Sequence, residues 1–415
     1  MSGNRRIALG LALVGGLAML ALLIGSRLAA DVMLRGDPAA ALEWDVNDQR
    51  ALEAFADRLF EGTPSNDDLA SAESSARRAF IGSPLRSGAV RVLGQVAERR
   101  GDEARARALI ATAAERWLYD LDAQIWMINA YLRSGDVSAA LRHVDETLRA
   151  RPRIWDEVLP SLVPLAVSQE GLEPLSKLLA TSPSWRLRFL EVLCANAAPM
   201  EPLRLFTALA DKSSPPTDPE LKAFLERLVK EGQLREAYLV WVKFLPKERM
   251  AALGNVHNGG FSFPISGLPF DWAFGNLTGS KINVIGRPDE IADLALRVEF
   301  NGNRAPFRHV AQMLLLSPGR YELTVAGRVE ALENERGLWW KVTCADGRLL
   351  GETDRILGTT GWKALRTEFV VPEESCVAQR LQLELASRIP IEEEVSGEAW
   401  FDDIAVSPLS SASGS

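Results

Sequence analysis

The residue pattern of the chain changes once, between Met250 and Asn255. From Ala51 to Met250 the sequence is rich in Ala, Leu, Arg and Glu, which are good helix formers. The stretch "NVHNGGFSFPISGLPFDW" (255–272) then brings glycine, proline and aromatic residues, and an alternation of apolar and polar residues follows it. We therefore expect a helical region followed by a β domain, with 255–272 as the entry to the second.

A period of 34 residues runs through the helical part. Ala72, Ala106 and Ala140 lie one period apart, and so do Gly101 and Gly135. Repeats of this length are typical of proteins in which each unit is a pair of helices. Small residues suit the points where two antiparallel helices touch, and glycine suits the turn between them.

The best-defined unit, 121–154, carries Tyr131, Gly135, Ala140 and Pro152 at spacings that resemble the tetratricopeptide repeat. The period is lost after Pro152, and 225–246 recovers the order of helix, glycine turn and alanine. The resemblance implies an α-solenoid over 41–250 whose concave face binds a partner protein and performs no chemistry of its own.

Beyond residue 255 five segments alternate apolar with polar residues, which is typical of strands that have one buried face. The segments are 294–300, 321–327, 338–344, 365–371 and 381–387. Turn signals such as Ser317-Pro318-Gly319 separate them. The spacing predicts an antiparallel β-sandwich or jelly roll over 255–409, followed by a disordered tail at 410–415. The predicted fold class is therefore multidomain, α then β.

Three short motifs carry a second resemblance. "NGGF" (258–261), "LRVEFNG" (296–302) and "GEAWFDDIAV" (397–406) resemble the start, an early strand and the last strand of jelly-roll carbohydrate-binding modules and their galactose-binding-like relatives. The resemblance implies that the C-terminal domain binds a glycan.

Those modules commonly bind a structural calcium through a Glu after the Phe and an Asp of the last strand. This sequence has Ser262 at the first position and retains Asp402 and Asp403 as candidate ligands. Calcium needs several oxygen donors. We therefore expect no cofactor and keep a structural calcium as the alternative.

Alternation also selects candidate sugar-binding residues. If Leu338 and Trp340 face the core, Trp339 faces outward. The same alternation turns Arg297 and Glu299, and Gln382 and Glu384, away from the core. On one shared sheet these residues would form a sugar surface, composed of Trp339, Arg297, Glu299, Gln382 and Glu384. The alternative is a solvated sheet face with cross-strand charge pairs.

The cysteines and the N-terminus bear on the compartment. Cys344 and Cys376 lie in strand-like segments and would pair in an oxidising compartment, whereas Cys194 lies in an apolar helix as a free thiol. Residues 7–25 carry no charge and are long enough to span a bilayer, after Arg5 and Arg6. With 1–30 as a cytoplasmic stub and membrane anchor, the bulk of the chain would lie in the periplasm of a bacterial-type cell. A cleaved signal peptide is the other interpretation.

Composition and motif searches weigh against two function classes. A net charge of -8 and a pI near 5.3 argue against a nucleic-acid partner. The sequence lacks a nucleophile elbow, a phosphate-binding glycine loop and a His-Glu-x-x-His motif, and its three histidines are far apart. We therefore expect no enzyme.

These observations favour a membrane-anchored envelope protein without catalytic activity. Its solenoid would bind a protein partner and its jelly roll a glycan, as an accessory factor in polysaccharide assembly or export. The alternatives are a pure protein-interaction scaffold with a structural β-sandwich, and a divergent glycan-processing enzyme, which would need two carboxylates in a cleft.

Overall fold

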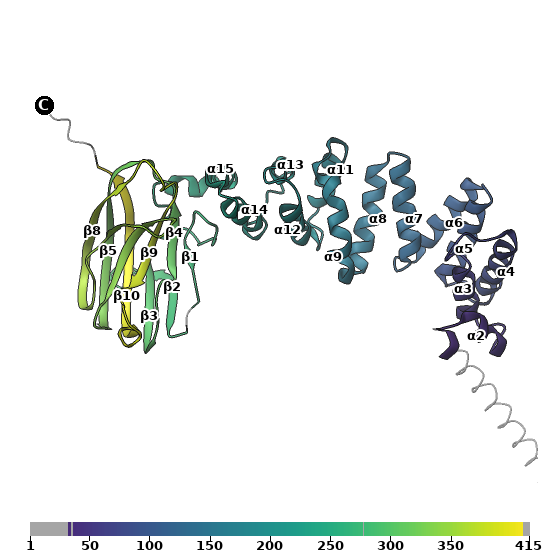
Figure 1. The fold of residues 1–415 in the computed structure, drawn as a ribbon, viewed down its shortest axis with the longest axis horizontal. Coiled ribbons are helices and arrows are strands. Elements are labelled where there is room, and N and C mark those ends of the chain that lie inside the picture. Colours follow the sequence, from purple (N-terminus) through teal and green to yellow (C-terminus); the bar gives the residue numbers. More distant parts are fainter. Residues whose placement is uncertain (1–31, 35, 277, 410–415) are drawn as a thin grey trace, which may run out of the picture. The chain divides into compact units, whose positions relative to one another are not determined.

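The computed structural model describes residues 32–34, 36–276 and 278–409. Helices come first and the strands follow from residue 273, as the residue pattern predicted (Figure 1). The chain separates into two compact units, each made of two segments. The first unit comprises the chain up to Val158 together with Gln169–Trp185. The second comprises Leu159–Ser168 together with the chain from Arg186 onward. The division thus lies within the helical part, whereas the sequence pattern placed the domain boundary between residues 250 and 255.

The helices of the first unit are α2 (Pro38–Trp44), α3 (Gln49–Arg58), α4 (Asn66–Gly82), α5 (Ser87–Arg99), α6 (Glu103–Arg116), α7 (Leu121–Arg133), α8 (Val137–Ala150), the 3-10 turn η1 (Pro152–Ile154), α9 (Trp155–Val158) and α11 (Gln169–Leu179). Those of the second are η2 (Leu159–Leu162), α10 (Val163–Val167), α12 (Arg186–Asn196), α13 (Pro202–Asp211), α14 (Asp218–Lys230), α15 (Leu234–Phe244) and η3 (Lys247–Ala252).

The helices α5 to α8 form two successive pairs, α5 with α6 and α7 with α8. Ser87 and Leu121, which begin α5 and α7, are 34 residues apart, as the period predicted. Asp102 and Asp136 cap α6 and α8, each accepting a hydrogen bond from the backbone amide three residues further on, at 3.1 and 2.9 Å. The N-terminal part is therefore an array of helix pairs, and its assignment to the tetratricopeptide family stays a prediction.

Glycine is required at particular points of this array. Gly101 and Gly135, between the helices of each pair, have φ of +82° and +77°, a region that favours glycine. Gly94 allows α5 and α6 to approach closely, since a Cβ there would lie 2.5 Å from Cγ1 of Ile110. After Pro152 the regular pairs give way to the short segments η1, α9, η2 and α10.

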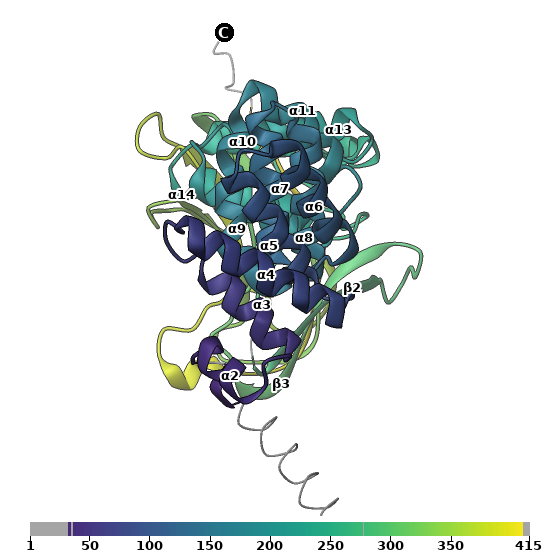
Figure 2. The same cartoon turned by 90° about the vertical axis from the view of Figure 1, so that its right-hand side faces the viewer.

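Two five-stranded antiparallel sheets form the β-sandwich. Sheet A has the order β1-β4-β9-β6-β7, and sheet B the order β2-β3-β10-β5-β8. Strand β2, labelled in Figure 2, forms an edge of sheet B. The strands are β1 (Ala273–Phe274), β2 (Ser280–Gly286), β3 (Leu294–Arg304), β4 (Val310–Leu314), β5 (Gly319–Glu333), β6 (Leu338–Cys344), β7 (Leu349–Glu352), β8 (Gly358–Val371), β9 (Gln379–Leu385) and β10 (Glu394–Pro408), with the 3-10 turn η4 (Pro390–Glu393) before β10.

Alternation decides the two sides of each strand, as expected. In β6 the residues 338, 340, 342 and 344 are buried, while the three between them are half-buried on the outer face. Trp340 lies at the centre of the core, edge-on to Trp272 at 5.8 Å and to Phe401 at 5.5 Å between ring centroids. Aromatic pairs at such distances stabilise a core beyond the area that they bury.

The segment 255–272, which precedes β1, packs against one end of the sandwich. Asn258 and Phe261 have φ of +53° and +52°, so the chain turns sharply and places the Phe261 ring in the core. The indole Nε1 of Trp272 donates a hydrogen bond to the carbonyl of Asn258 (3.0 Å), and the amide of Asn255 donates one to the carbonyl of Val406 (2.9 Å). The glycine-rich stretch therefore serves packing.

Helix α15 packs against the same end of the sandwich. Trp241 contacts His257 edge-on (4.9 Å between centroids) and Phe270 (5.7 Å), and Tyr238 also contacts Phe270 (5.3 Å). Both Trp241 and Phe270 are buried. This aromatic contact joins the last helices to the β domain.

The apolar segment 7–25 lies outside the described residues, and so does the tail at 410–415. Among the helices that the structure describes, none combines the length and the apolar character needed to cross a bilayer.

Candidate functional site

The predicted sugar-binding residues do not lie on one sheet. Trp339 is on β6 and Gln382 and Glu384 are on β9, all in sheet A, whereas Arg297 and Glu299 are on β3 in sheet B. The prediction that they form one surface is wrong, because alternation decides only whether a side chain points out of the sandwich. The sheet to which a strand belongs depends on pairing with distant strands.

The outer face of sheet A carries a row of paired residues across four strands. Ala273 on β1 pairs with Ala311 on β4, Ala311 pairs with Gln382 on β9, and Gln382 pairs with Lys341 on β6. Residues paired in register on neighbouring strands lie close together on the same face. The row therefore passes from small side chains at the edge to long polar side chains at the centre.

The outer face of sheet A has a groove of about 720 Å³, and the small and the long polar side chains of this row line it. Ala273 and Ala311 leave space, and Gln382, Lys341 and Thr343 supply polar groups. A concave site with a few fixed polar groups is the usual form of a small-ligand site.

Two contacts fix the polar side chains of the groove. The ammonium Nζ of Lys341 lies 3.2 Å from Oε2 of Glu384. The amide Nε2 of Gln382 donates a hydrogen bond to the carbonyl of Arg308 (2.6 Å), which leaves the amide oxygen of Gln382 to accept. Both donors and acceptors are thus presented to a ligand.

Trp339 stands beside the groove on the same face, and its partner in register is Glu384. The guanidinium carbon of Arg355 lies 4.9 Å and the Nζ of Lys341 5.4 Å from the ring centroid. The indole Nε1 is buried without a hydrogen-bond partner in the described part of the chain. The ring is therefore held by two cations beside the groove, and is not an open stacking platform.

The predicted pair on sheet B forms cross-strand charge contacts. The guanidinium of Arg297 donates two hydrogen bonds to Glu398, at 2.5 and 2.9 Å, and lies 3.2 Å from Glu299. The hydrogen bond from Arg297 lowers the pKa of Glu398. This arrangement matches the alternative of a solvated face with charge pairs.

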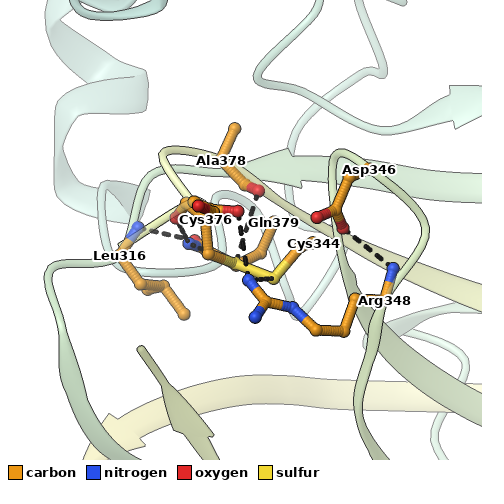
Figure 3. Close-up of a disulfide and its surroundings, with 8 residues drawn as sticks. Leu316, Cys344, Asp346, Arg348, Cys376, Ala378 and Gln379 are labelled. Atoms are coloured by element: carbon orange, nitrogen blue, oxygen red, sulfur yellow. Dashed lines mark hydrogen bonds between the residues drawn. A yellow bond between two sulfur atoms is a disulfide. The ribbon is translucent and has the colours of Figure 1, made fainter. Parts of the chain in front are cut away.

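The disulfide predicted from the cysteines is present. Cys344 at the end of β6 is bonded to Cys376, with a Cα separation of 5.2 Å (Figure 3). Cys376 lies in the loop before β9, whereas the sequence pattern placed it in a strand-like segment. The side chain of Gln379 donates to the carbonyl of Cys376 (2.7 Å) and accepts from the amide of Leu316 (2.8 Å), as Figure 3 shows.

The bond lies between two hollows of the second unit. Cys344 lines the groove on sheet A, and Cys376 lines a second cavity of about 480 Å³ beside α15. Tyr238 and Leu239 of α15 line that cavity too. The disulfide thus holds a wall of each hollow in place.

The residues at the expected calcium position do not fit that ion. Asp402 is buried, and its Oδ2 lies 3.2 Å from Nη1 of Arg287 while its Oδ1 accepts from the amide of Asp403 (2.8 Å). Asp403 is exposed, and Ser262 brings no carboxylate. The positive charge beside Asp402 therefore comes from Arg287. In the described ranges no group of three or more His, Cys, Asp or Glu side chains is placed to hold a metal ion.

Burial raises the pKa of Asp402 to about 6, and the nearby Asp403 and Asp293 add to the rise, while Arg287 opposes it. The guanidinium of Arg287 is itself stacked over the Trp362 ring, at 4.3 Å from the centroid. It also contacts Asp289. This cluster connects the β2–β3 turn to the last strand.

Three residues that line the groove were not among the predicted site residues. Arg380 precedes Gln382 by two positions on β9, so alternation already turned it to the same face. Lys341 was turned outward by the same rule but was not proposed as a site residue. Arg308 precedes β4 and lies in no alternating segment, so only the structure brings it to the groove.

No family model and no curated protein matches the sequence. The β-sandwich resembles carbohydrate-binding modules of known structure. A CBM4 structure is 15% identical with a TM-score of 0.29, and the match covers 37% of this chain and 99% of that one. TmCBM61 in complex with β-1,4-galactotriose is 16% identical with a TM-score of 0.27, covering 38% and 99%. CBM6cm-2 from Cellvibrio mixtus lichenase 5A in complex with cellotriose is 10% identical with a TM-score of 0.21, covering 34% and 100%.

Proposed function

We propose that the groove on the outer face of sheet A binds a carbohydrate chain without catalysis. The observation that carries the proposal is the groove itself, which is opened by Ala273 and Ala311 and lined by Gln382, Lys341 and Thr343. Sugar hydroxyls both donate and accept hydrogen bonds, and an amide, an ammonium and a hydroxyl together supply both functions. Trp339 adds an apolar edge beside these groups.

The charges of the groove favour binding over hydrolysis. Glycoside hydrolysis commonly needs two carboxyl groups on either side of the scissile bond. Glu384 is the only carboxylate that lines the groove in the described part of the chain, and it is paired with Lys341. We infer a binding protein and no enzyme.

The rest of the chain would bind a protein partner and anchor the groove-bearing domain at a membrane. The helix pairs suit the docking of a protein partner, as in tetratricopeptide solenoids, and residues 7–25 would anchor the chain in a bacterial-type inner membrane. The Cys344–Cys376 disulfide suits an oxidising compartment such as the periplasm. We propose a role as an accessory factor in polysaccharide assembly or export.

A protein-interaction scaffold is the second candidate. Leu239 and Val377 line the cavity beside α15 and are 67% and 64% exposed. Exposed apolar side chains at a cavity are a feature of protein-binding sites. On this interpretation the sandwich would have a structural role.

The test is affinity electrophoresis of the full-length protein through gels that contain one soluble polysaccharide each. We expect retardation by at least one glycan, and its loss in Gln382→Ala and Lys341→Ala. Arg297→Ala and Glu299→Ala, on the opposite sheet, serve as matched controls and should bind as the unmodified protein does. If no glycan retards the protein, or if the controls weaken binding as much as the groove variants, the groove is not the glycan site.

A further inference from the structure

The groove on sheet A is richer in positive than in negative charge. Arg308, Lys341 and Arg380 line it, and among the described residues Glu384 supplies its one carboxylate. Lys341 pairs with Glu384, so the charge left over belongs to the two arginines. Neither arginine has a carboxylate within 4.0 Å among the residues that the structure describes.

The arginines in the strands of sheet B differ from Arg308 and Arg380 in this respect. All five arginines in its strands lie within 4.0 Å of a carboxylate, namely Arg297, Arg304, Arg320, Arg328 and Arg366. The chain as a whole carries a net charge of -8, so acidic partners are abundant. Arg308 and Arg380 therefore lack an ion pair among the described residues, although the protein as a whole is acidic.

Both arginines are held by the backbone around the central Gln382. Arg380 is two residues before it on β9, where it pairs in register with Met313 on β4 and Thr343 on β6. Arg308 offers its carbonyl to the amide of Gln382 (2.6 Å). Both arginines line the groove together with Gln382.

The charge of Arg308 acts on its neighbour in sequence, His309. Burial lowers the pKa of the adjacent His309, and the positive charge of Arg308 lowers it further.

We propose that the ligand of the groove is an acidic polysaccharide, whose uronate carboxylates pair with Arg308 and Arg380 while its hydroxyls bind Gln382 and Thr343. This inference rests on the proposed glycan-binding function. A guanidinium presents two parallel N–H donors that match the two oxygens of a carboxylate. Neutral glycans would leave both arginines without such a partner.

The experiment uses the full-length protein and matched polymer pairs. Alginate, polygalacturonate and hyaluronate are each compared with their carboxyl-reduced forms, beside neutral β-1,4-galactan and xylan, with poly-L-glutamate as a polyanion that is not a sugar. We expect binding to at least one acidic polymer, at least tenfold weaker after carboxyl reduction and weaker in high salt. Poly-L-glutamate should bind at least tenfold more weakly than that polymer.

The variants Arg308→Gln and Arg380→Gln should each weaken binding of that polymer at least tenfold. Arg320→Gln and Arg366→Gln, on sheet B, are the controls and should leave it unchanged. The melting temperatures of the groove variants should match the unmodified protein, because neither arginine has an ion-pair partner to lose.

Three results would overturn the inference: equal affinity for acidic and carboxyl-reduced polymers, full binding by both arginine variants, or equal binding of poly-L-glutamate. If Gln382→Ala still abolished binding in the first case, the groove would remain a glycan site that does not distinguish acidic from neutral chains. In the second case it would remain a glycan site in which the arginines do not bind the carboxylates. The absence of binding to every polysaccharide would instead remove the proposed function itself.

Discussion

Lys341 on β6 and Glu384 on β9 form an ion pair across neighbouring strands of sheet A, with 3.2 Å between Nζ and Oε2. Both side chains are about a quarter exposed, so the pair lies in the wall of the groove. Pairs at such exposure contribute little to stability. The contact therefore matters mainly for the charge that the groove presents to a ligand.

Lys341→Met would leave the Glu384 carboxylate unpaired in the groove. We expect affinity for an acidic polysaccharide to fall at least tenfold, because the carboxylate repels uronates, while the free energy of unfolding changes by less than about 1 kcal/mol. Glu384→Gln should not weaken affinity, because it removes the carboxylate and leaves the Lys341 ammonium free. This variant should bind the acidic polysaccharide at least as tightly as the unmodified protein. Isothermal titration calorimetry separates the two variants, and equal weakening in both would contradict this account.

The carboxyl group of Asp402 makes stability depend on pH. Its folded-state pKa, about 6, lies above the value of about 3.9 in an unfolded chain. Between these values the folded protein binds a proton that the unfolded chain has lost, so the contribution to stability is present at low pH and disappears as the pH rises to about 6. Asp402→Asn has no such titration.

The free energy of unfolding of the unmodified protein relative to Asp402→Asn should therefore fall by about 3 kcal/mol between about pH 4 and pH 7, that is, two pH units at about 1.4 kcal/mol each. Denaturant unfolding at a series of pH values measures the difference, in which other titrating groups cancel. A difference that stays constant over this range would show that Asp402 keeps an ordinary pKa.

Arg287 takes the role of counter-ion for Asp402 above pH 6. Arg287→Ala leaves a buried carboxylate without its cation and should destabilise the protein by about 3 kcal/mol at pH 7.5, and by less at pH 5, where Asp402 is protonated. Calcium or a chelator should leave the melting temperature of the unmodified protein unchanged. A rise in melting temperature on calcium addition would reverse our conclusion about the donor set.

The Cys344–Cys376 disulfide closes a loop of 32 residues in sequence separation. Loop-closure entropy at this length corresponds to about 3 to 4 kcal/mol. A reducing agent should therefore lower the melting temperature of the unmodified protein, and the double variant Cys344→Ala, Cys376→Ala should melt at the lower temperature in either condition. Cys194→Ala, which removes the buried free thiol, should respond to the reducing agent as the unmodified protein does.

Gly94→Ala tests the close approach of α5 and α6. The added methyl group would lie 2.5 Å from Cγ1 of Ile110, so the buried Ile110 side chain or the two helices must shift, which costs about 1 to 3 kcal/mol. The better helix propensity of alanine offsets about 1 kcal/mol of that cost. Gly62→Ala, with nothing within 4 Å, is the control. Faster amide hydrogen exchange in α5 and α6 is expected for Gly94→Ala alone, and unchanged exchange would contradict the close contact.

The residue pattern was most informative where structure depends on neighbours along the chain. The 34-residue period placed the helix pairs α5–α6 and α7–α8, because each repeat forms its own turn at Gly101 or Gly135. The pattern did not place the division between the two compact units, since the packing of Trp241 against Phe270 joins the last helices to the sandwich across a change in sequence character.

The candidate site divides in the same way. Alternation turned Trp339, Gln382 and Glu384 outward, and the structure keeps them on one face because β6 and β9 are neighbours. It also turned Arg297 and Glu299 outward, but β3 pairs within the other sheet.

The order of helices and strands, and the side of each strand that faces the core, follow from the residues of each segment, because backbone propensity and residue alternation are local. Which outward side chains share a face depends on how the strands pair in the folded domain. This pairing brings the carbonyl of Arg308 to Gln382 and places Arg287 against Asp402. Strand pairing joins segments far apart in sequence, and a pattern of period two carries no information about which strands will meet.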